Sequence, residues 1–401
     1  MAKPKHLRPA DLRGTSQLAV DATLGLVDLV ENLHHNISRT PWPLGQTSTQ
    51  PTRGITGLVY RSIRGVTRLV GGSVDALLGQ LLALLGSDDA ATIASPEREA
   101  VLAALNGVLG DHLAARANPL ATPMSLRHDG QTLRPGSPVA SPRRRWLLTV
   151  HGLCMGAAQW RRNGHDHGEM LAEALGASRL ALHYNSGLHI SQNGRELAAQ
   201  LEALLGDWPL PVDEIVILGH SMGGLVARSA CQQAEAAGHR WRQRLKSLVF
   251  LGSPHHGAPL ERGGHWVDTL LGASPYTAAF ARLGQLRSAG ITDLRHGRVL
   301  DPDWADAPAA RSGSDTRVAL PLPAGVACFS AAASLSTGPG GKLTDLLGDG
   351  LVPLASAHGQ HADPARCLHF DAAHQWTGYG LHHLDLLDDA AVAAQLRRWL
   401  V

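Results

Sequence analysis

A serine that follows a predicted β-strand is the residue of this sequence best suited to act as a nucleophile. Ser221 lies in the stretch EIVILGHSMGGLVARSA, residues 214–230, where an apolar β-branched run meets a glycine-rich turn and then a helix-like segment. A serine hydroxyl becomes reactive when a sharp turn lifts it clear of a sheet and a base can reach it. Gly219 and Gly223 remove the Cβ atoms that would collide where strand and helix approach. An ordinary glycine-rich turn is the alternative, but the strand before and the helix after favour the nucleophile.

The composition is that of a globular protein with a sizeable core. Of 401 residues, 44% are hydrophobic and 17% are charged, and the formal net charge is +2. This charge is too small to indicate a nucleic-acid partner. We expect the scattered cysteines, listed here, to be buried thiols and not a disulfide framework: Cys154, Cys231, Cys328 and Cys367.

The elements that must position the serine begin near Trp146, where strands and helices start to alternate. This alternation predicts a mostly parallel, doubly wound α/β sheet with catalytic residues at the carboxyl ends of its strands. A long segment, residues 261–322, interrupts the alternation, and we interpret it as a lid-like insertion. The predicted strands are residues 146–150, 180–184, 214–218, 245–251, 326–332 and 366–371, and the predicted helices are 194–205, the segment after Ser221, and 384–400.

Residues 1–140 are predicted to form a helical accessory region, and residues 141–401 the catalytic domain. Within the accessory region the apolar period predicts helices at 15–34 and 55–85. A further helix opens at Ser95, with Ser95 as cap and a proline at the first helical position.

The helix at 55–85 has basic residues on the face opposite its apolar residues. It either packs on the protein with solvated arginines or makes a peripheral contact with an anionic membrane surface. Its charges argue against a membrane span, and the basic N-terminus lacks the apolar core and cleavage site of a signal peptide. We therefore expect a cytoplasmic protein. The charged residues are Arg61, Arg64, Arg68 and Asp75.

Five motifs between Trp146 and Val401 together resemble α/β-hydrolase-fold lipases and esterases. The resemblance is to bacterial triacylglycerol-lipase-like enzymes and to GPI inositol-deacylase-like serine hydrolases. It implies the α/β-hydrolase fold and an enzyme that requires no cofactor. The motifs are, in chain order, HGL at 151–153, GHSMGG at 219–224, GSPHHGAP at 252–259, GDGLVP at 348–353 and HHLDLL at 382–387.

The resemblance implies a catalytic triad with Ser221 as the nucleophile. The acid is expected between the serine and the histidine in the chain, and Asp349 of GDGLVP matches the acidic position of the family. Asp345 and Asp315 are lower-ranked alternatives. The alternative interpretation is that Asp349 is only a turn residue between two glycines.

The base is expected after the final strand. A histidine followed by Leu-Asp-Leu in the family favours His383, while His374 and His382 are rivals that spacing does not exclude. His220, inside the serine motif, is expected to orient the turn and not to act as the base.

Two backbone N–H groups are expected to form the oxyanion hole. Met222 is predicted to be the first residue of a helix, where an N–H faces a developing negative charge. The resemblance supplies the second donor, the N–H of Leu153, which follows His151 and Gly152.

The predicted function is that of a serine carboxylesterase or lipase with an ester or lipid substrate. The same triad would serve an acyltransferase or an amidase, and a non-catalytic membrane-associated scaffold is the rival from another class. Clusters of histidine and aspartate lack the spacing of a defined metal site and are interpreted as solvated loop residues. These are His165 and His167, then His255, His256 and His265, and the run Asp301, Asp303 and Asp306.

Overall fold

The computed structural model divides the chain into two compact units, which we describe separately. One unit comprises Met1–Ser95 and Leu113–Leu120, and the other comprises Pro96–His112 and Ala121–Val401. The second unit therefore begins earlier in the chain than the predicted boundary at residue 140. The residues described are 10–21, 24, 96–136, 138–258, 288–305, 315–340 and 348–401.

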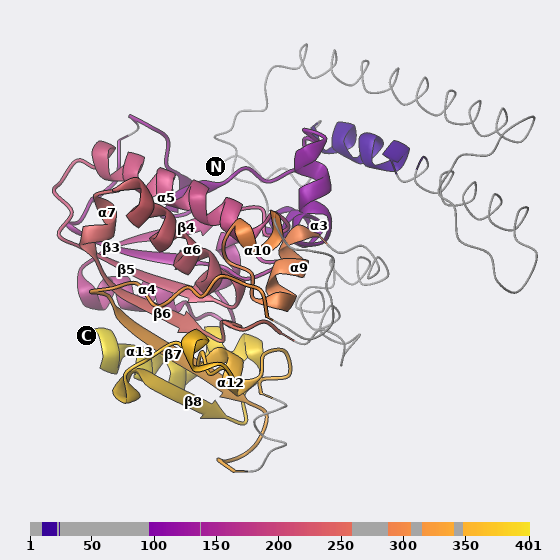
Figure 1. Ribbon diagram of the computed structural model, residues 1–401. Coiled ribbons are helices and arrows are strands. Elements are labelled where there is room, and N and C mark those ends of the chain that lie inside the picture. The colour runs from indigo at the N-terminus through magenta and orange to yellow at the C-terminus, as the bar shows by residue number, and fades with distance from the viewer. Residues whose placement is uncertain are drawn as a thin grey trace, which may run out of the picture. The chain divides into compact units, whose positions relative to one another are not determined.

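An eight-stranded sheet organises the second unit (Figure 1). Its strand order is β2-β1-β4-β3-β5-β6-β7-β8. All pairs from β4 to β8 are parallel, whereas β1 runs antiparallel to β2 and β4. The strands are β1 (Ser125–His128), β2 (Gln131–Thr132), β3 (Arg145–Val150), β4 (Ser178–His183), β5 (Glu214–His220), β6 (Leu245–Leu251), β7 (Ala327–Ser334) and β8 (Gln375–Tyr379).

The sheet order and its connecting helices are those of the α/β-hydrolase fold, which confirms the predicted fold class. Short 3₁₀ turns span Ala157–Trp160, Pro364–Arg366, Ala372–His374 and His383–Leu387. The helices are α3 (Pro96–Ala115), α4 (His167–Leu175), α5 (Ile190–Asp207), α6 (Met222–Ala237), α7 (Trp241–Arg244), α9 (Ala289–His296), α10 (Pro302–Ala305), α12 (Leu354–Ala357) and α13 (Ala390–Leu400).

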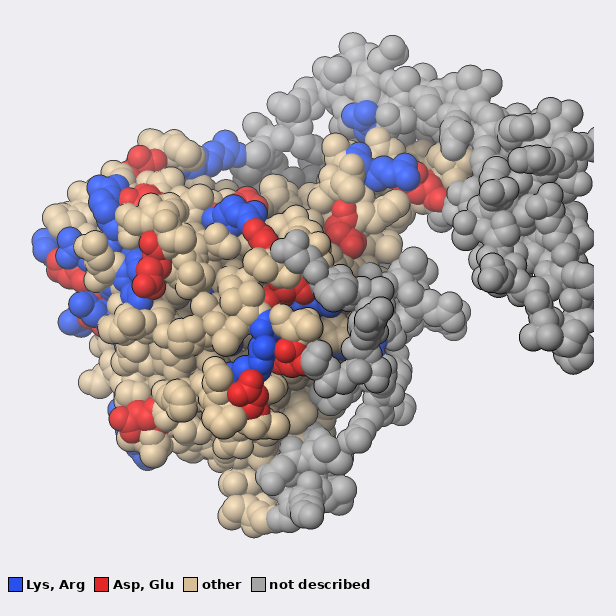
Figure 2. Space-filling model, in the orientation of Figure 1, with Lys and Arg blue, Asp and Glu red and all other residues tan. Residues whose placement is uncertain are grey.

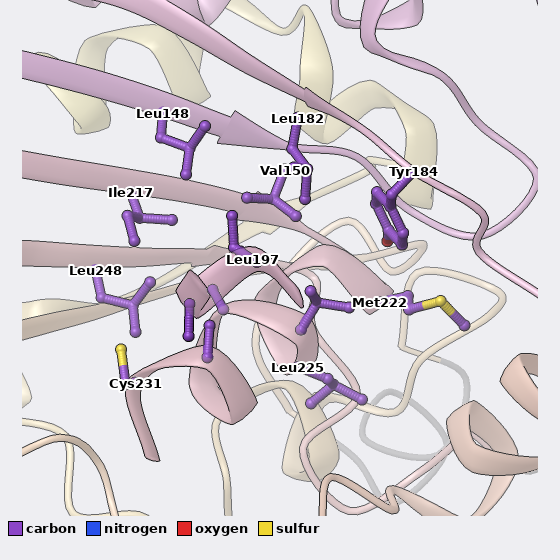
Figure 3. Packing of buried hydrophobic residues seen from close by; sticks show 14 of the residues in the cluster. Leu148, Val150, Leu182, Tyr184, Leu197, Ile217, Met222, Leu225, Cys231 and Leu248 are labelled. Atoms are coloured by element: carbon purple, nitrogen blue, oxygen red, sulfur yellow. The ribbon is translucent and has the colours of Figure 1, made fainter. Parts of the chain in front are cut away.

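Alternate residues of each central strand face opposite layers of the core, because successive side chains in a strand point to opposite sides. In β5, Ile215 and Ile217 join the cluster that includes α5 and α6. Val216 and Leu218 join the cluster that includes α4 and α13. Figure 3 shows the first layer, where strand residues such as Ile217 lie among side chains of α5 and α6. Helices thus cover both faces of the sheet and hold its strand ends in place.

Most predicted strands are confirmed, and β6 has the predicted bounds, Leu245–Leu251. The prediction of a last strand at residues 366–371 is wrong. Leu368 and Phe370 have the apolar alternation of a strand, but they lie in irregular chain. Their side chains pack into the core without forming a strand. The true edge strand is β8, which is short and only half-buried over Gln375–Thr377, so its sequence carries little strand signal.

The four cysteines are free thiols, as predicted. Cys154, Cys231 and Cys328 are buried, whereas Cys367 is only partly buried.

The other unit contributes a helical segment at residues 10–21. There, Asn118 Nδ2 donates a hydrogen bond of 3.0 Å to the Gly14 carbonyl oxygen. The predicted helix at 55–85, most of the helix at 15–34 and much of the 261–322 insertion lie outside the described residues. Within the described part of the chain, every helix is too short or too polar to cross a membrane.

Replacement of Gly223 by alanine should destabilise the second unit. An added Cβ would lie 2.2 Å from the Val150 carbonyl oxygen and 2.6 Å from that of His151. Because these are backbone atoms that cannot rotate away, we expect Gly223→Ala to lose about 1–3 kcal/mol of unfolding free energy. Gly338→Ala is the matched control, since nothing lies within 4 Å of an added Cβ there. Equal urea midpoints for the two variants would contradict the close approach.

Candidate active site

Ser221 occupies a strained turn between β5 and α6. Its backbone has φ 54° and ψ −123°, a region that L-residues rarely adopt. The turn is held by two hydrogen bonds, from Ser221 N to Leu251 O at 2.8 Å and from Gly224 N to Ser221 O at 3.1 Å. Such a geometry lifts a serine side chain off the end of a sheet, as a nucleophile requires.

The glycines around Ser221 let helix α6 approach the sheet closely. A Cβ on Gly219 would lie 2.6 Å from Gly224 Cα, and one on Gly224 would lie 2.0 Å from Ser253 Oγ. The N-terminus of α6 therefore lies directly against the ends of the central strands. This arrangement sets the position of Met222, the first residue of the helix.

Asp349 lies in the turn that follows β7 and is 2% exposed. One carboxylate oxygen, Oδ1, accepts hydrogen bonds from the backbone N–H groups of Leu351 at 2.9 Å and Val352 at 2.8 Å. The other, Oδ2, lies 2.6 Å from His383 Nδ1. The carboxylate is thus fixed in orientation, with one oxygen directed at the imidazole.

The alternative acids are not in this arrangement. Asp315 forms ion pairs with Arg317 and Arg366, and its pKa is lowered chiefly by the hydrogen bond from Arg317. Asp345 lies outside the described residues.

His383 begins the 3₁₀ turn that follows β8, and it is 1% exposed. Its backbone N–H donates to the Asp349 carbonyl oxygen at 3.2 Å, so main chain and side chain contact the same residue. Because a carboxylate accepts, Nδ1 is the donor of this contact, and in a neutral imidazole Nε2 then keeps its lone pair. In the described part of the chain this Nε2 has no hydrogen-bond partner.

The rival histidines lie in other environments. His382 is exposed, and its backbone N–H donates to Asp385 Oδ2 at 2.8 Å. The ring of His374 lies against Phe329, with ring centroids 4.2 Å apart. Of the three candidates, His383 is the one that contacts Asp349.

His220 links the serine turn to the histidine turn. Its Nε2–H donates to the His383 carbonyl oxygen at 3.3 Å, and the two ring centroids are 4.7 Å apart. Burial, followed by the nearby His383, lowers the pKa of His220 well below its usual value. The orientation of the loop by a neutral His220 stays a prediction. Among the described residues, the side chains of Ser221 and His383 are not hydrogen-bonded to each other. This is common in active sites without a bound ligand.

The loop after β3 lies against Ser221. A Cβ on Gly152 would be 3.1 Å from Ser221 Cβ and 3.2 Å from His220 Nδ1. The backbone N–H groups of Leu153 and Met222 take no part in the hydrogen bonds that join the described turns and loops. Their role as oxyanion donors stays a prediction.

Two contacts near the candidate site could not be predicted from the sequence. Arg162 Nε lies 3.3 Å from Asp388 Oδ2, and Asn163 Nδ2 donates to the same oxygen at 2.6 Å. They join the loop after β3 to the turn that begins at His383, although 225 residues separate Asn163 from Asp388. No local pattern reveals such a pair.

Tyr184 is a second residue that the sequence leaves unassigned. Its ring stacks on His151 with centroids 4.2 Å apart. A signal for it exists in the strand register, because Val150 pairs with Leu182 and the residues after both strands must therefore be neighbours.

The interpretation of the other histidines and aspartates as solvated is wrong for several of them. His167, His255 and Asp303 are buried. Asp303 accepts hydrogen bonds from three backbone N–H groups, those of Val299, Leu300 and Val318, which offset the burial of its charge. His265 and Asp306 lie outside the described residues, and no cluster of three potential metal ligands occurs among the residues that are described.

Basic and acidic side chains lie interspersed on the face shown in Figure 2. The pair formed by Arg240 Nε and Glu202 Oε1, 2.6 Å apart, is an example from this unit.

Comparison with known proteins gives limited matches. A family model described as a domain of unknown function (DUF7379) matches residues 120–294. None of the curated proteins matches this chain.

Solved structures with similarity include lipases, esterases and thioesterases. The mature lipase BlEst2 of Bacillus licheniformis is 17% identical with a TM-score of 0.41, covering 67% of this chain and 97% of that one. The esterase of Pyrobaculum calidifontis is 16% identical with a TM-score of 0.40, covering 81% and 97%. YbtT, a type II thioesterase of the yersiniabactin pathway, is 17% identical with a TM-score of 0.36, covering 66% and 96%.

The strained backbone of Ser221 yields a prediction about stability. Ser221→Gly and Ser221→Ala both remove the hydroxyl, but glycine alone adopts φ 54° and ψ −123° without a steric cost. Relief of about 1–3 kcal/mol of strain, less about 0.4–1 kcal/mol of added unfolded-state entropy, leaves Ser221→Gly the more stable by about 1 kcal/mol. Urea unfolding of the two variants measures this difference, and an equal or lower midpoint for Ser221→Gly would exclude strain at this turn.

Proposed function

We propose that this protein is a serine ester hydrolase that acts through Ser221, His383 and Asp349. The observation that carries the proposal is the buried contact of 2.6 Å between His383 Nδ1 and Asp349 Oδ2, beside the strained serine turn. The three residues follow β5, β7 and β8, in the chain order Ser, Asp, His of this fold.

The protonation state of the histidine defines the first step. With its Nδ1 proton donated to Asp349, the imidazole has a lone pair on Nε2 for the Ser221 hydroxyl proton. The serine oxygen then attacks the ester carbonyl carbon, and a tetrahedral intermediate forms. His383 returns the proton to the leaving alcohol, which breaks the ester bond and leaves an acyl-enzyme. Water, activated by the same Nε2, releases the acid and regenerates the serine.

Charge develops at two places during this reaction. The imidazolium of His383 is offset by the Asp349 carboxylate, whose other oxygen is held by the Leu351 and Val352 amides. The oxyanion is offset by the backbone N–H groups of Met222 and Leu153, with the positive end of α6 adding to the first.

The Met155 sulfur would lie 3.4 Å from a Cβ on Gly152, next to Ser221. This apolar neighbour supports an ester with an apolar acyl chain as the substrate.

Covalent labelling tests the nucleophile directly. A fluorophosphonate probe should label the full-length protein, while Ser221→Ala should not react, because the alanine lacks the attacking oxygen. Hydrolysis of p-nitrophenyl butyrate by Ser221→Ala should fall about a millionfold, as for other triads. Equal labelling of both proteins, or labelling of neither, would refute the proposed function.

The two adjacent histidines provide a matched test of the base. His383→Ala should lower kcat for p-nitrophenyl butyrate by about 10⁴-fold or more, because Ser221 loses its proton acceptor. His382→Ala should retain kcat within about threefold, because that side chain is exposed and outside the triad. A greater loss of kcat in His382→Ala than in His383→Ala would show that His383 is not the base.

A further inference from the structure

We propose that His151 is a positioning residue that fixes the peptide between Gly152 and Leu153, so that the Leu153 N–H serves the oxyanion hole. This inference rests on the proposed function and adds to it the element that orients one of the two donors. Its evidence lies in the hydrogen bonds of His151 and in the contact of Gly152 with Ser221.

The partners of His151 determine which ring nitrogen carries the proton. The Tyr184 backbone N–H can only donate, and it donates to His151 Nε2 at 3.4 Å. Nε2 is therefore the acceptor, and the proton lies on Nδ1. That Nδ1–H donates to the Gly152 carbonyl oxygen at 2.9 Å. Burial lowers the pKa of His151 to about 4, so this neutral form persists at neutral pH.

The bond to Gly152 O determines where the Leu153 N–H points. In a trans peptide the C=O and the following N–H point in opposite directions. Because the His151 ring holds the oxygen on its own side, the Leu153 N–H lies on the other side. The peptide borders the nucleophile, since a Cβ on Gly152 would be 3.1 Å from Ser221 Cβ. Rotation of this peptide would instead present a carbonyl oxygen to the developing oxyanion, which repels it.

Tyr184 holds the imidazole in this position. The two rings are stacked, with an angle of 20° between their planes. The Tyr184 hydroxyl donates to the His151 carbonyl oxygen at 2.8 Å, so the preceding peptide is fixed as well. Tyr184 directly follows β4, which pairs with β3, and the strand pairing therefore supports both residues. The carbonyl oxygens of two consecutive residues, His151 and Gly152, thus each accept a hydrogen bond from a side chain.

Two other roles for His151 fit these contacts less well. A general base needs an available nitrogen, but both ring nitrogens of His151 are in hydrogen bonds and the residue is 0% exposed. A residue that only fills space would tolerate an apolar ring of similar size. If His151 only fills space, His151→Phe should keep its activity, whereas the proposed positioning role requires a loss.

Three substitutions at residue 151 separate the role of Nδ1 from packing. His151→Asn places an amide N–H near the position of Nδ1 and can donate to Gly152 O. His151→Gln places its amide near the position of Nε2, on the side of Tyr184. His151→Phe keeps a ring for stacking but donates nothing. The matched Asn and Gln variants differ by one methylene group. They also differ in the contact that they can restore, which is the one to Gly152 O for Asn and the one on the side of Tyr184 for Gln.

We expect His151→Phe and His151→Gln to lower kcat/KM for p-nitrophenyl butyrate by about 100-fold, the size of a lost oxyanion donor. His151→Asn should stay within about tenfold of the wild-type enzyme. A boronic acid that forms a tetrahedral adduct with Ser221 should lose affinity by the same factor as kcat/KM. The planar amide N-(4-nitrophenyl)butyramide should bind all variants within about threefold, because a ground-state analogue does not use the hole fully.

Any of three results would overturn the proposal. The first is a kcat/KM of His151→Phe within threefold of the wild-type value, and the second is equal activity of the Asn and Gln variants. The third is an equal loss of affinity for the boronic acid and for the planar amide. If the residue 151 variants fail to fold, Tyr184→Phe gives the test, because it keeps the ring stack and removes the bond to the His151 carbonyl. It should lower kcat/KM and boronic acid affinity by the same three- to tenfold, and unchanged values would overturn the proposal.

Fluorophosphonate labelling distinguishes failure of this inference from failure of the proposed function. Absence of Ser221-dependent labelling in the wild-type protein refutes the proposed function. Normal labelling and turnover of the wild-type protein, together with normal turnover of His151→Phe, refutes only the role of His151.

Discussion

The close approach of helix α6 to the ends of β3 and β5 is the constraint on which the site depends. At Gly223 the backbone of the helix lies so near the Val150 carbonyl that even a methyl group would overlap it. A turn this tight forces Ser221 into its strained backbone conformation and presents the first N–H of α6 beside it. Since β3 ends at the same contact, the loop that carries Leu153 is brought to the serine by the same packing. Strain at one residue is thus maintained by the burial of two strands and a helix.

The local part of this arrangement could be predicted from the sequence, because it is encoded in consecutive residues. Glycines spaced around Ser221, with a β-branched run before and a helix after, specify both the turn and its place at a strand end. The proposed partners of the serine are encoded differently. Asp349 and His383 meet through the order of β7 and β8, which no spacing rule provides, and the choice of His383 over its neighbours depended on family resemblance. The structure adds the contact with Asp349 that singles it out.

The features that sequence analysis missed are long-range or lack a periodic pattern. Phe370 alternates with Leu368 as strand residues do, yet both anchor irregular chain, while the half-buried β8 shows little apolar alternation. Hydrogen bonding of Asp303 to three backbone amides makes its burial tolerable, although a composition-based interpretation places an aspartate at the surface. Arg162 contacts Asp388, although most of the second unit's sequence separates them. Such contacts follow from the assembled sheet and not from neighbouring residues.

Burial also determines the charge of the histidines in and near the candidate site. A positive charge near His383 would oppose the imidazolium that forms during proton transfer. Desolvation lowers the pKa of His151 to about 4 and of His183 to about 2, and it lowers that of His220 well below the usual value. These rings are therefore neutral at physiological pH, and those of His151 and His220 donate hydrogen bonds to backbone carbonyl oxygens, while the permanent charge of Arg162 is paired with Asp388. The Asp349 carboxylate is in direct contact with His383, so in the proposed mechanism a proton accepted by His383 is stabilised at that ring.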